Sequence, residues 1–399
     1  MKPGEPLKVL FSHYGILDGA GFSRSFLIAK GLADIGHKVT LITGQSAGFT
    51  FPYIKDVTGN LSIISFPDFS PISFRQAGLG ILNIILKSLY ATVNRFDIVH
   101  SDSGHRPSSG LPCIINRWIY KSKYISEWWD YFGKGGLYDQ MPKLRRFFLG
   151  NYDNWSEIYN KKIADGVIAL SEFTRQRAIQ AGIKDKKIII VHGGSDIENI
   201  EHYIDTKRRG NFGIDPDCFL FGFIGIDEAE FNDLEPFVKA MQCIKKTQNV
   251  KWFTTGSKLK RETLLRFNIN DDLYEFGWID YSNYSDLISC ADIFLLFLQP
   301  NLQNEARFPN KLGDYLAAGR LILTNGFGEI NSYITNYPES FINVNWNSQD
   351  IQRAIIELLD QKKNILINGG KSRDIAEKFN SWNLKALEVE KFYYRILNT

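Results

Sequence analysis

The sequence of 399 residues predicts an α/β protein made of two doubly wound domains. Short apolar runs typical of strands alternate along most of the chain with longer amphipathic stretches typical of helices. A glycine-rich turn joins the first strand to the first helix, and a polar stretch at 195–217 separates an earlier series of strands from a later one. Together these observations indicate two parallel sheets, each covered by helices on both faces.

The first domain opens with a strand at 8–14, a glycine turn at 16–21, a helix at 22–35 and a strand at 37–43. Elements in this order form the βαβ unit of a parallel sheet. The same alternation then predicts strands at 61–66, 96–102, 123–130, 164–171 and 186–194, with a long helix at 74–95 and another at 172–182. We therefore expect residues 1–195 to form one domain.

The polar stretch 195–217 is expected to connect this domain to a second one, at 196–381. Its strands are predicted at 218–225, 251–256, 274–279, 292–298, 320–325 and 340–345, with helices between them. Two helical segments, at about 348–362 and 369–397, close the chain.

Composition excludes several classes of function. The net charge is only +3, so no broad electrostatic case for nucleic acid follows. The four cysteines are far apart and the six histidines form no ligand spacing, which predicts reduced thiols and no metal site. With no cleavable signal and no run of ~18 apolar residues, we expect a cytoplasmic protein without a membrane-spanning helix.

The stretch RFPNKLGDYLAAGR, at 307–320, combines a helix start with polar residues. Pro309 is expected at the first helical position, which leaves three amides without helical partners, those of Asn310, Lys311 and Leu312. With the helix dipole and the charge of Lys311, they would form an anion site. An ordinary amphipathic helix with a solvated basic start would have the same sequence.

Two further side chains of this stretch extend the hypothesis. Arg307 precedes Lys311 by one turn and could add a second positive charge. Asp314 shares a helix face with Lys311, where its carboxylate could accept hydrogen bonds from a ribose diol. Because ligands of open parallel sheets bind beyond the carboxyl ends of the strands, we expect 307–320 and the turn at 16–21 to line one cleft.

Two loops of the first domain carry candidate residues at predicted strand ends. Gly19 and Gly21 permit a close approach of backbone to ligand, and the amides of Ala20 and Gly21 could face a phosphate or a sugar. A tight turn of any βαβ unit is the alternative. His105 could donate to an acceptor hydroxyl and Arg106 could pair with an anion, or the two could cap their own loop.

The stretch SEWWDYFGKGG, at 126–136, also follows a predicted strand. Trp128 and Trp129 offer flat faces on which sugar rings pack, while Glu127 and Asp130 could bind hydroxyl groups. The alternative is one core tryptophan, one surface tryptophan and solvated carboxylates.

Basic and aromatic residues lie together in MPKLRRFFLG, at 141–150. Basic side chains beside exposed aromatic ones suit an anionic membrane surface. A normal amphipathic helix that turns its phenylalanines inward is the alternative.

Two loops of the second domain also carry candidates. Trp278 could form part of a base pocket or be a core aromatic. Glu329, in NGFGEI, could contact a sugar or its phosphate, or belong to a hairpin-like turn.

Several stretches resemble the GT-B glycosyltransferases, in particular the retaining group called family four. The most specific are YEFGWIDYSNYSDLISCADIFLLFL (274–298) and RFPNKLGDYLAAGRLILTNGFGEI (307–330), which resemble that group's donor-binding core. DGAGFSRSFLIAKGLADIGHKVTLIT (18–43), FDIVHSD (96–102) and ADGVIALSEFTRQRAIQAGIKDKKIIIVHGGSD (164–196) resemble parts of its first domain.

The chain departs from that group at its phosphate-binding positions. Where the family often has an Arg and a Lys after the fifth-strand glycine, here Gly225, the sequence has Ile226 and Phe231. The first acidic residue of the paired-glutamate motif would fall at Ala306, and the second is Asp314.

The resemblance implies two Rossmann-like domains facing across a cleft, an acceptor domain at 1–195 and a donor domain at 196–381, with a C-terminal helix at about 382–399 crossing back. Donor binding would involve Gly19, Ala20, Gly21, Gly225, Trp278, Arg307, Asn310, Lys311, Leu312, Asp314 and Glu329. Acceptor binding would involve Arg106, Glu127, Trp128 and Trp129. Asp130, His105 and Lys311 would be the catalytic set, without a metal.

The function that follows is metal-independent transfer of a hexose from a nucleotide sugar to a glycan or lipid-linked acceptor, with retention, in cell-surface polysaccharide or glycoconjugate synthesis. The nucleotide sugar is a co-substrate, no cofactor is expected, and 141–150 would contact the inner face of the membrane. The alternatives are a non-catalytic nucleotide- or glycan-binding GT-B subunit and a nucleotide-sugar epimerase.

Overall fold

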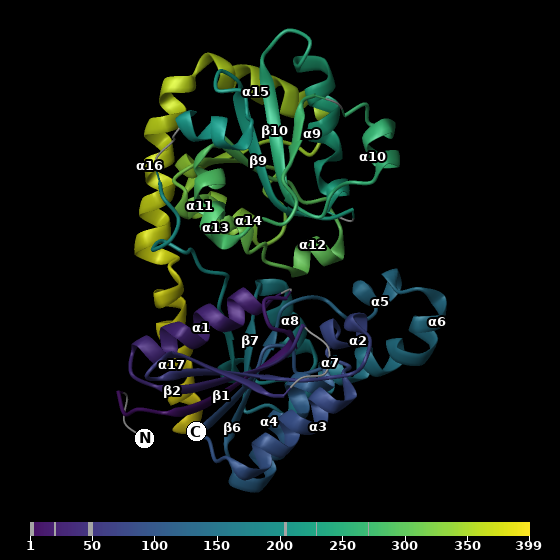
Figure 1. The fold of residues 1–399 in the computed structure, drawn as a ribbon, viewed down its shortest axis with the longest axis vertical. Helices are drawn as coiled ribbons and strands as arrows, with labels where there is room; N and C mark the ends of the chain where they lie inside the picture. Colours follow the sequence, from purple (N-terminus) through teal and green to yellow (C-terminus); the bar gives the residue numbers. More distant parts are fainter. Residues whose placement is uncertain (1–3, 20, 47–50, 203–205, 229, 270) are drawn as a thin grey trace. The chain divides into compact units, whose positions relative to one another are not determined.

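The computed structural model describes residues 4–19, 21–46, 51–202, 206–228, 230–269 and 271–399. They form two compact units, each with a sheet at its centre (Figure 1). The N-terminal unit comprises Met1–Gly193, Ala306–Phe308 and Trp382–Thr399, and the C-terminal unit comprises Gly194–Glu305 and Pro309–Ser381.

The N-terminal unit has an eight-stranded sheet with the order β3-β4-β2-β1-β5-β6-β7-β8. Its strands are β1 (Lys8–Ile16), β2 (Lys38–Gly44), β3 (Tyr53–Thr58), β4 (Leu61–Phe66), β5 (Ile98–Ser101), β6 (Lys123–Trp128), β7 (Gly166–Ala169) and β8 (Ile188–Ile190). Neighbouring strands are parallel except for the edge strand β3, which pairs antiparallel with β4.

Helices cover both faces of this sheet (Figure 1). They are α1 (Phe22–Asp34), α2 (Ile72–Gln76), α3 (Ile81–Val93), α4 (Pro107–Tyr120), α5 (Leu137–Gln140), α6 (Lys143–Arg145), α7 (Asn151–Ile163), α8 (Glu172–Gln180) and the C-terminal α17 (Trp382–Leu397). Alternate residues of β1 serve two cores, because Val9 and Phe11 pack with α1 and α17 while Leu10 packs in the core on the α4 face.

The C-terminal unit has six parallel strands in the order β11-β10-β9-β12-β13-β14. The strands are β9 (Phe219–Ile226), β10 (Val250–Gly256), β11 (Leu273–Glu275), β12 (Ile293–Leu296), β13 (Leu321–Thr324) and β14 (Phe341–Asn343). The helices are α9 (Phe231–Ile244), α10 (Arg261–Arg266), α11 (Tyr281–Ser289), α12 (Leu302–Ala306), α13 (Lys311–Ala317), α14 (Ile330–Asn336), α15 (Ser348–Asp360) and α16 (Lys362–Phe379).

Two predicted helices are each divided in the structure. The helix expected at 74–95 is broken at Gly78, which has φ +72°, and at Gly80, where a Cβ atom would lie 2.5 Å from the Asp68 carboxylate. The helix expected at 369–397 is interrupted between α16 and α17, at Asn380 and Ser381, which belong to the C-terminal unit.

The edge strand β3 and helices α4, α5 and α7 of the N-terminal unit were not among the predicted elements. In both sheets the strand order reverses beside the first strand. This places a switch point between β1 and β5 in one sheet, and between β9 and β12 in the other. Crevices at such points, outside the carboxyl ends of the strands, are where ligands bind in open α/β sheets.

Candidate functional site

Helix α13 is fixed at the switch point of the C-terminal sheet by its one tyrosine. The Tyr315 hydroxyl accepts a hydrogen bond of 3.1 Å from the Ile224 amide in β9, and its ring stacks on Phe294 of β12 with centroids 4.1 Å apart. Gly313 allows the helix to approach the Gly194 carbonyl so closely that a Cβ atom would overlap it. The first turn of α13 therefore lies at the carboxyl end of β9.

Lys311 places an ammonium group at this strand end. Its Nζ lies 3.1 Å from Oε2 of Glu230, the residue that precedes α9, and 3.9 Å from the ring centroid of Phe223 in β9. Both charged side chains are largely buried. The predicted cation is thus present at the switch point, with an acid as its neighbour.

The predicted set of three unpaired amides at this helix start is wrong. Helix α13 begins at Lys311 rather than at Pro309, and the Leu312 amide donates to the Pro309 carbonyl at 3.0 Å. The tight first turn uses one of the three donors, because the Pro309 carbonyl lies within its reach. Asn310 is the exposed residue that precedes the helix.

Asp314 faces Tyr284 of α11. The Tyr284 hydroxyl donates to the Asp314 carboxylate at 2.6 Å. Burial raises the pKa of Asp314 to about 7, the Tyr284 hydrogen bond opposes this, and the negative charge of Asp196 adds to it. A carboxylate in this state can either accept or donate a hydrogen bond near neutral pH.

The loop after β9 is acidic where the family resemblance led us to look for cations. Ile226 and Phe231 are both core residues, 2% exposed. Gly225 has φ +69°, and its amide donates to the Thr255 hydroxyl at 3.1 Å. The only charged residues at 226–231 are Asp227, Glu228 and Glu230.

Two predicted donor residues lie on other loops of the C-terminal unit. Trp278 is 86% exposed and therefore is not a core aromatic. Glu329 is half-buried and precedes α14, so its loop joins a strand to a helix rather than forming a hairpin-like turn. Gly326 and Gly328 in that loop both have positive φ.

Arg307 belongs to the N-terminal unit, whereas Lys311 belongs to the C-terminal unit. Its neighbour Ala306 accepts a hydrogen bond of 2.5 Å from the Ser171 hydroxyl, and Phe308 stacks on His192 with centroids 4.6 Å apart.

The switch point of the N-terminal sheet holds a cluster that the sequence analysis missed. His13 Nδ1 lies 2.5 Å from an Asp102 oxygen, and the same carboxylate accepts hydrogen bonds from the hydroxyls of Ser25 and Ser109 and from the Tyr14 amide. His13 and Asp102 are fully buried. The signal was present, because HSD (100–102) spans the end of β5 and SHYG (12–15) lies near the end of β1, and the two strands are neighbours.

The glycine turn before α1 is closed by an aromatic ring. The Gly19 amide donates to the Ile16 carbonyl at 3.0 Å, so it is used within the turn. Gly21 has φ +75°, and a Cβ atom there would overlap the ring of Trp129. Ala20 lies outside the described residues.

Glu127 is enclosed within the N-terminal unit. Its carboxylate accepts hydrogen bonds from Arg24 Nε, at 3.0 Å, and from the Trp129 indole, and it lies 3.2 Å from His100 Nε2. Although burial opposes ionisation, Arg24 and His100 lower the pKa of Glu127 to about 2. Glu127 therefore positions Trp129 and presents no surface of its own.

The other residues after β6 differ in exposure. Trp128 is a core residue whose indole donates to Glu157 at 2.8 Å. Trp129 and Asp130 are half-buried, and the negative charge of Asp130 contributes to raising the pKa of Tyr14, behind burial and Asp102. Among these residues, Trp129 and Asp130 are the accessible ones.

His105 and Arg106 form a packed corner at the start of α4. His105 is 2% exposed, lies 3.2 Å from the Ser103 hydroxyl and packs on the Phe132 ring with centroids 4.1 Å apart. Burial, followed by the charge of Arg106, holds the pKa of His105 well below its usual range, so the imidazole is neutral. Arg106 pairs with Asp153 at 3.1 Å.

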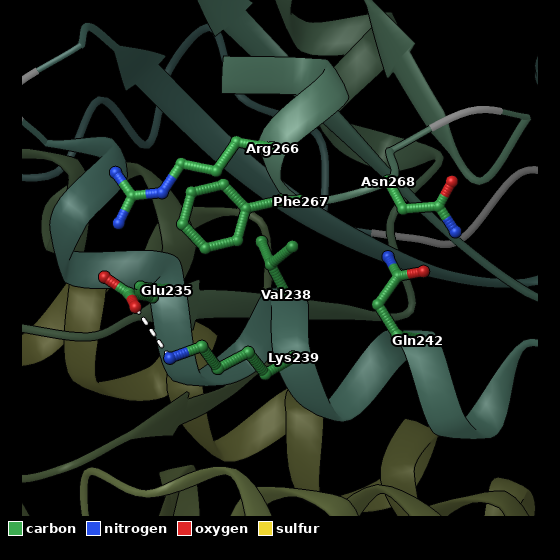
Figure 2. A pocket seen from close by; sticks show the side chains of 7 residues that line it. All are labelled: Glu235, Val238, Lys239, Gln242, Arg266, Phe267 and Asn268. Atoms are coloured by element: carbon green, nitrogen blue, oxygen red, sulfur yellow. Dashed lines mark hydrogen bonds and ion pairs between the residues drawn. The ribbon is translucent and has the colours of Figure 1, made fainter. Parts of the chain in front are cut away.

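A separate hollow of about 410 Å³ lies between α9 and the end of α10 (Figure 2). Val238 and Phe267 form its apolar part, and Lys239 pairs with Glu235 at 2.7 Å on one side. None of the predicted site residues lines it. Among the described residues, no helix is long and apolar enough to cross a bilayer.

Comparison with known proteins finds glycosyltransferases. Residues 25–199 match the model of glycosyltransferase family 4. An uncharacterised glycosyltransferase of Methanocaldococcus jannaschii is 22% identical over 247 residues, which is 59% of this chain and 60% of that relative.

Solved structures cover nearly the whole chain. Sucrose-phosphate synthase from Thermosynechococcus elongatus superimposes with a TM-score of 0.74 at 15% identity, covering 99% of this chain and all of that one. HepE of Anabaena, solved with UDP-glucose, gives 0.67 at 13% identity, covering 96% and 98%. The chain therefore has the GT-B fold, and its residues 25–199 are similar to glycosyltransferase family 4.

Proposed function

We propose that this protein is a metal-independent glycosyltransferase that moves a hexose from a nucleotide sugar to a glycan or lipid-linked acceptor, with retention of configuration. The observation that carries the proposal is the position of Lys311. Its ammonium group lies at the carboxyl end of β9, at the switch point of the C-terminal sheet. That is where a parallel sheet of this type binds a ligand, and an ammonium group there suits a diphosphate.

The proposed donor site is built from the C-terminal unit. The diphosphate would take the place that Glu230 now holds beside Lys311, and Lys311 would stabilise the charge that develops on the leaving group. Asp314 would bind the ribose, with Tyr284 orienting its carboxylate. Gly225 offers a backbone that a ligand can approach, since a Cβ atom there meets nothing within 4 Å.

The proposed acceptor site belongs to the N-terminal unit. Trp129 would provide a face for a sugar ring, and Asp130 would accept from an acceptor hydroxyl. Glu127 and Trp128 would act by holding this loop in place, because both side chains are enclosed. His105, as a neutral imidazole, would place the loop that contains Arg106.

Residues 141–150 would make the membrane contact. Leu144 and Phe147 are 73% and 76% exposed, and Lys143 beside them is exposed as well. These side chains fit contact with an anionic membrane, at whose inner face the proposed lipid-linked acceptor would lie. The side chains of Arg145 and Phe148 lie outside the described part of the structure.

One observation favours a second candidate, a nucleotide- or glycan-binding subunit without catalysis. Lys311 is paired with Glu230, and Ile226 and Phe231, on either side of the loop after β9, stand where the family resemblance would place two cations. Such a site has less positive charge to stabilise a leaving diphosphate, even if it still binds a nucleotide.

A thermal-shift panel of UDP-, GDP- and ADP-sugars tests both candidates. UDP-glucose is the first donor to try, because HepE was solved with it. A rise in Tm with one donor, its loss in Lys311→Ala, and slow release of free nucleotide would support the transferase. The rise without any release, with every acceptor tried, would favour the binding subunit. No rise with any donor would reject the transferase and a nucleotide-binding subunit.

A further inference from the structure

Helix α3 buries polar side chains and exposes a stripe of apolar ones, which is the reverse of an ordinary surface helix. Its buried residues are Asn83, Lys87 and Ala91, at intervals of four. On the opposite side the exposed fractions are 62% for Ile81, 49% for Ile85, 56% for Leu89 and 75% for Val93. A helix of a globular protein normally buries its apolar stripe and exposes its polar one.

Internal hydrogen bonds fix this orientation of α3. The Lys87 ammonium donates to the His13 carbonyl at 2.7 Å, and the Asn83 side chain donates to the Phe66 carbonyl at 3.1 Å. The Asn83 backbone amide donates to the Asp68 carboxylate at 2.8 Å. Rotating α3 to bury its isoleucines would break these buried hydrogen bonds and leave Lys87 without them, so the apolar stripe stays outside.

Helix α7 shows the same inversion. All five of its buried residues are polar: Asp153, Ser156, Glu157, Asn160 and Lys161. Its aromatic residues face outward, with Trp155 56% exposed and stacked on Tyr159 at a centroid distance of 4.7 Å. As in α3, a buried hydrogen bond fixes the polar face toward the interior, because Lys161 donates to the Ser126 hydroxyl at 2.8 Å.

Helix α4 joins the other two into one surface. Asn116 of α4 donates to the Ala91 carbonyl of α3 at 2.7 Å, and Arg106, just before α4, pairs with Asp153 of α7. The three helices lie on the same side of the sheet (Figure 1). Trp118 of α4 is 64% exposed and Ile119 is 50% exposed.

Helices α3, α4 and α7 bear no exposed acidic side chain, and Asp165, just after α7, is paired with Arg117 of α4 at 2.9 Å. Helices α3 and α4 contain no Asp or Glu, and both acids of α7, Asp153 and Glu157, are buried. Exposed basic residues follow the helices: Arg95 after α3 and Lys121 after α4. Apolar side chains with Trp and Tyr among them, bordered by Lys and Arg, match the headgroup region of an anionic bilayer.

We propose that the outward face of α3, α4 and α7 docks on an anionic lipid bilayer, with the helices lying in the membrane interface. Leucine, isoleucine and valine side chains would enter the acyl boundary, and Trp118 and Trp155 would lie at headgroup level. A second copy fits less well, because pairing two such faces would bring their basic borders together. The inference extends the membrane contact proposed for 141–150 and is independent of sugar transfer.

The test is sedimentation of the full chain with phosphatidylcholine vesicles, with and without 30% phosphatidylglycerol. We expect binding to the anionic vesicles that weakens at high salt. Replacing both Leu89→Ser and Trp118→Ala should weaken binding by tenfold or more, since burying one such side chain is worth roughly 1.5–3 kcal/mol. The matched control is Leu265→Ser with Phe379→Ala, at two exposed positions of the C-terminal unit, which should bind as the parent does.

Three results would overturn the proposal: no binding to anionic vesicles, undiminished binding of the Leu89/Trp118 variant, or an equal loss in the control. A dimer in solution that the Leu89/Trp118 variant dissociates would instead identify a second copy as the occupant. Thermal melts of both variants show whether either has lost its fold. Nucleotide-induced thermal shifts, measured in parallel, report on the proposed donor site separately from membrane binding.

Discussion

The ammonium group of Lys311 lies 3.1 Å from a carboxylate oxygen of Glu230, at the start of α13 and beside the carboxyl end of β9. The side chains are only 13% and 19% exposed. An incoming diphosphate would therefore meet a cation that is already paired, and Glu230 would have to move or be repelled. We therefore expect Glu230 to lower the affinity of the proposed site for anions.

Replacing Glu230→Gln should tighten the binding of UDP, because it removes a negative charge beside the cation and keeps the shape of the side chain. We expect a gain of about two- to fivefold, the scale of a partly exposed ion pair. Isothermal titration measures it. Glu235→Gln, which affects the Lys239 pair on the outer side of α9, is the control and should leave the affinity unchanged. Unchanged or weaker binding in the Glu230 variant would place the nucleotide elsewhere.

The pKa of Asp314 predicts a pH dependence of stability. Because this pKa is raised from its usual value to about 7, the folded state holds the proton more tightly than the unfolded state does. The contribution of Asp314 to stability is therefore highest below its unfolded pKa and falls as the pH rises towards 7. Asp314→Asn should thus raise Tm more at pH 8 than at pH 5, as differential scanning fluorimetry can show.

Tyr284→Phe tests the cause of that shift. The Tyr284 hydroxyl donates to the Asp314 carboxylate and opposes the rise of its pKa. Removing it should move the stability loss to higher pH. A pH profile identical to that of the parent would show that this hydrogen bond does not control the carboxylate.

Much of the fold could be predicted because strands and most helices carry their usual periodicity. Helix α4 was missed because its first turns are Ser108, Ser109 and Gly110, small residues that allow close packing and carry no apolar signal. Helix α7 was missed for a different reason. Its buried face is polar and its aromatic residues are exposed, so the spacing of its apolar residues marks the exposed face instead of the buried one. A helix with a buried polar face is hard to recognise from its own sequence, because the groups that its polar side chains bind lie on elements that are distant in sequence.

The candidate site was predictable only in part. Lys311 and Asp314 could be found because a helix start after proline fixes their spacing. The acid opposite Lys311 could not, since Glu230 lies 81 residues away and only the fold brings it near. Likewise, nothing in SEWWD distinguishes the enclosed Glu127 from the accessible Asp130, because that depends on Arg24 and His100 from other elements.

Gly21→Ala should destabilise the N-terminal unit by more than the usual cost of a positive φ. The backbone φ of +75° costs a non-glycine residue about 1–2 kcal/mol, and the added Cβ would also overlap Trp129. Gly182→Ala, at φ +89° with nothing within 4 Å, is the matched control for the backbone cost alone. Urea unfolding measures both. Equal losses of stability in the two variants would show that Gly21 and Trp129 are not in tight contact. The same would follow if adding Trp129→Ala to Gly21→Ala fails to recover the stability lost beyond that of Gly182→Ala.

Glu127→Gln should cost far more stability than an exposed carboxylate would. Glu127 is fully buried, and its lowered pKa means that its charge stabilises the folded state at pH values above the unfolded pKa, an effect lost only as the pH falls towards 2. Removing one partner of a buried pair typically costs about 3–5 kcal/mol, because it leaves Arg24 buried without its countercharge. Glu172→Gln, at the exposed pair with Arg175, should cost less than about 1 kcal/mol. Urea unfolding at pH 7 compares the two, and a Glu127 variant as stable as the Glu172 variant would show that the buried carboxylate is not what holds Arg24 and Trp129 in place.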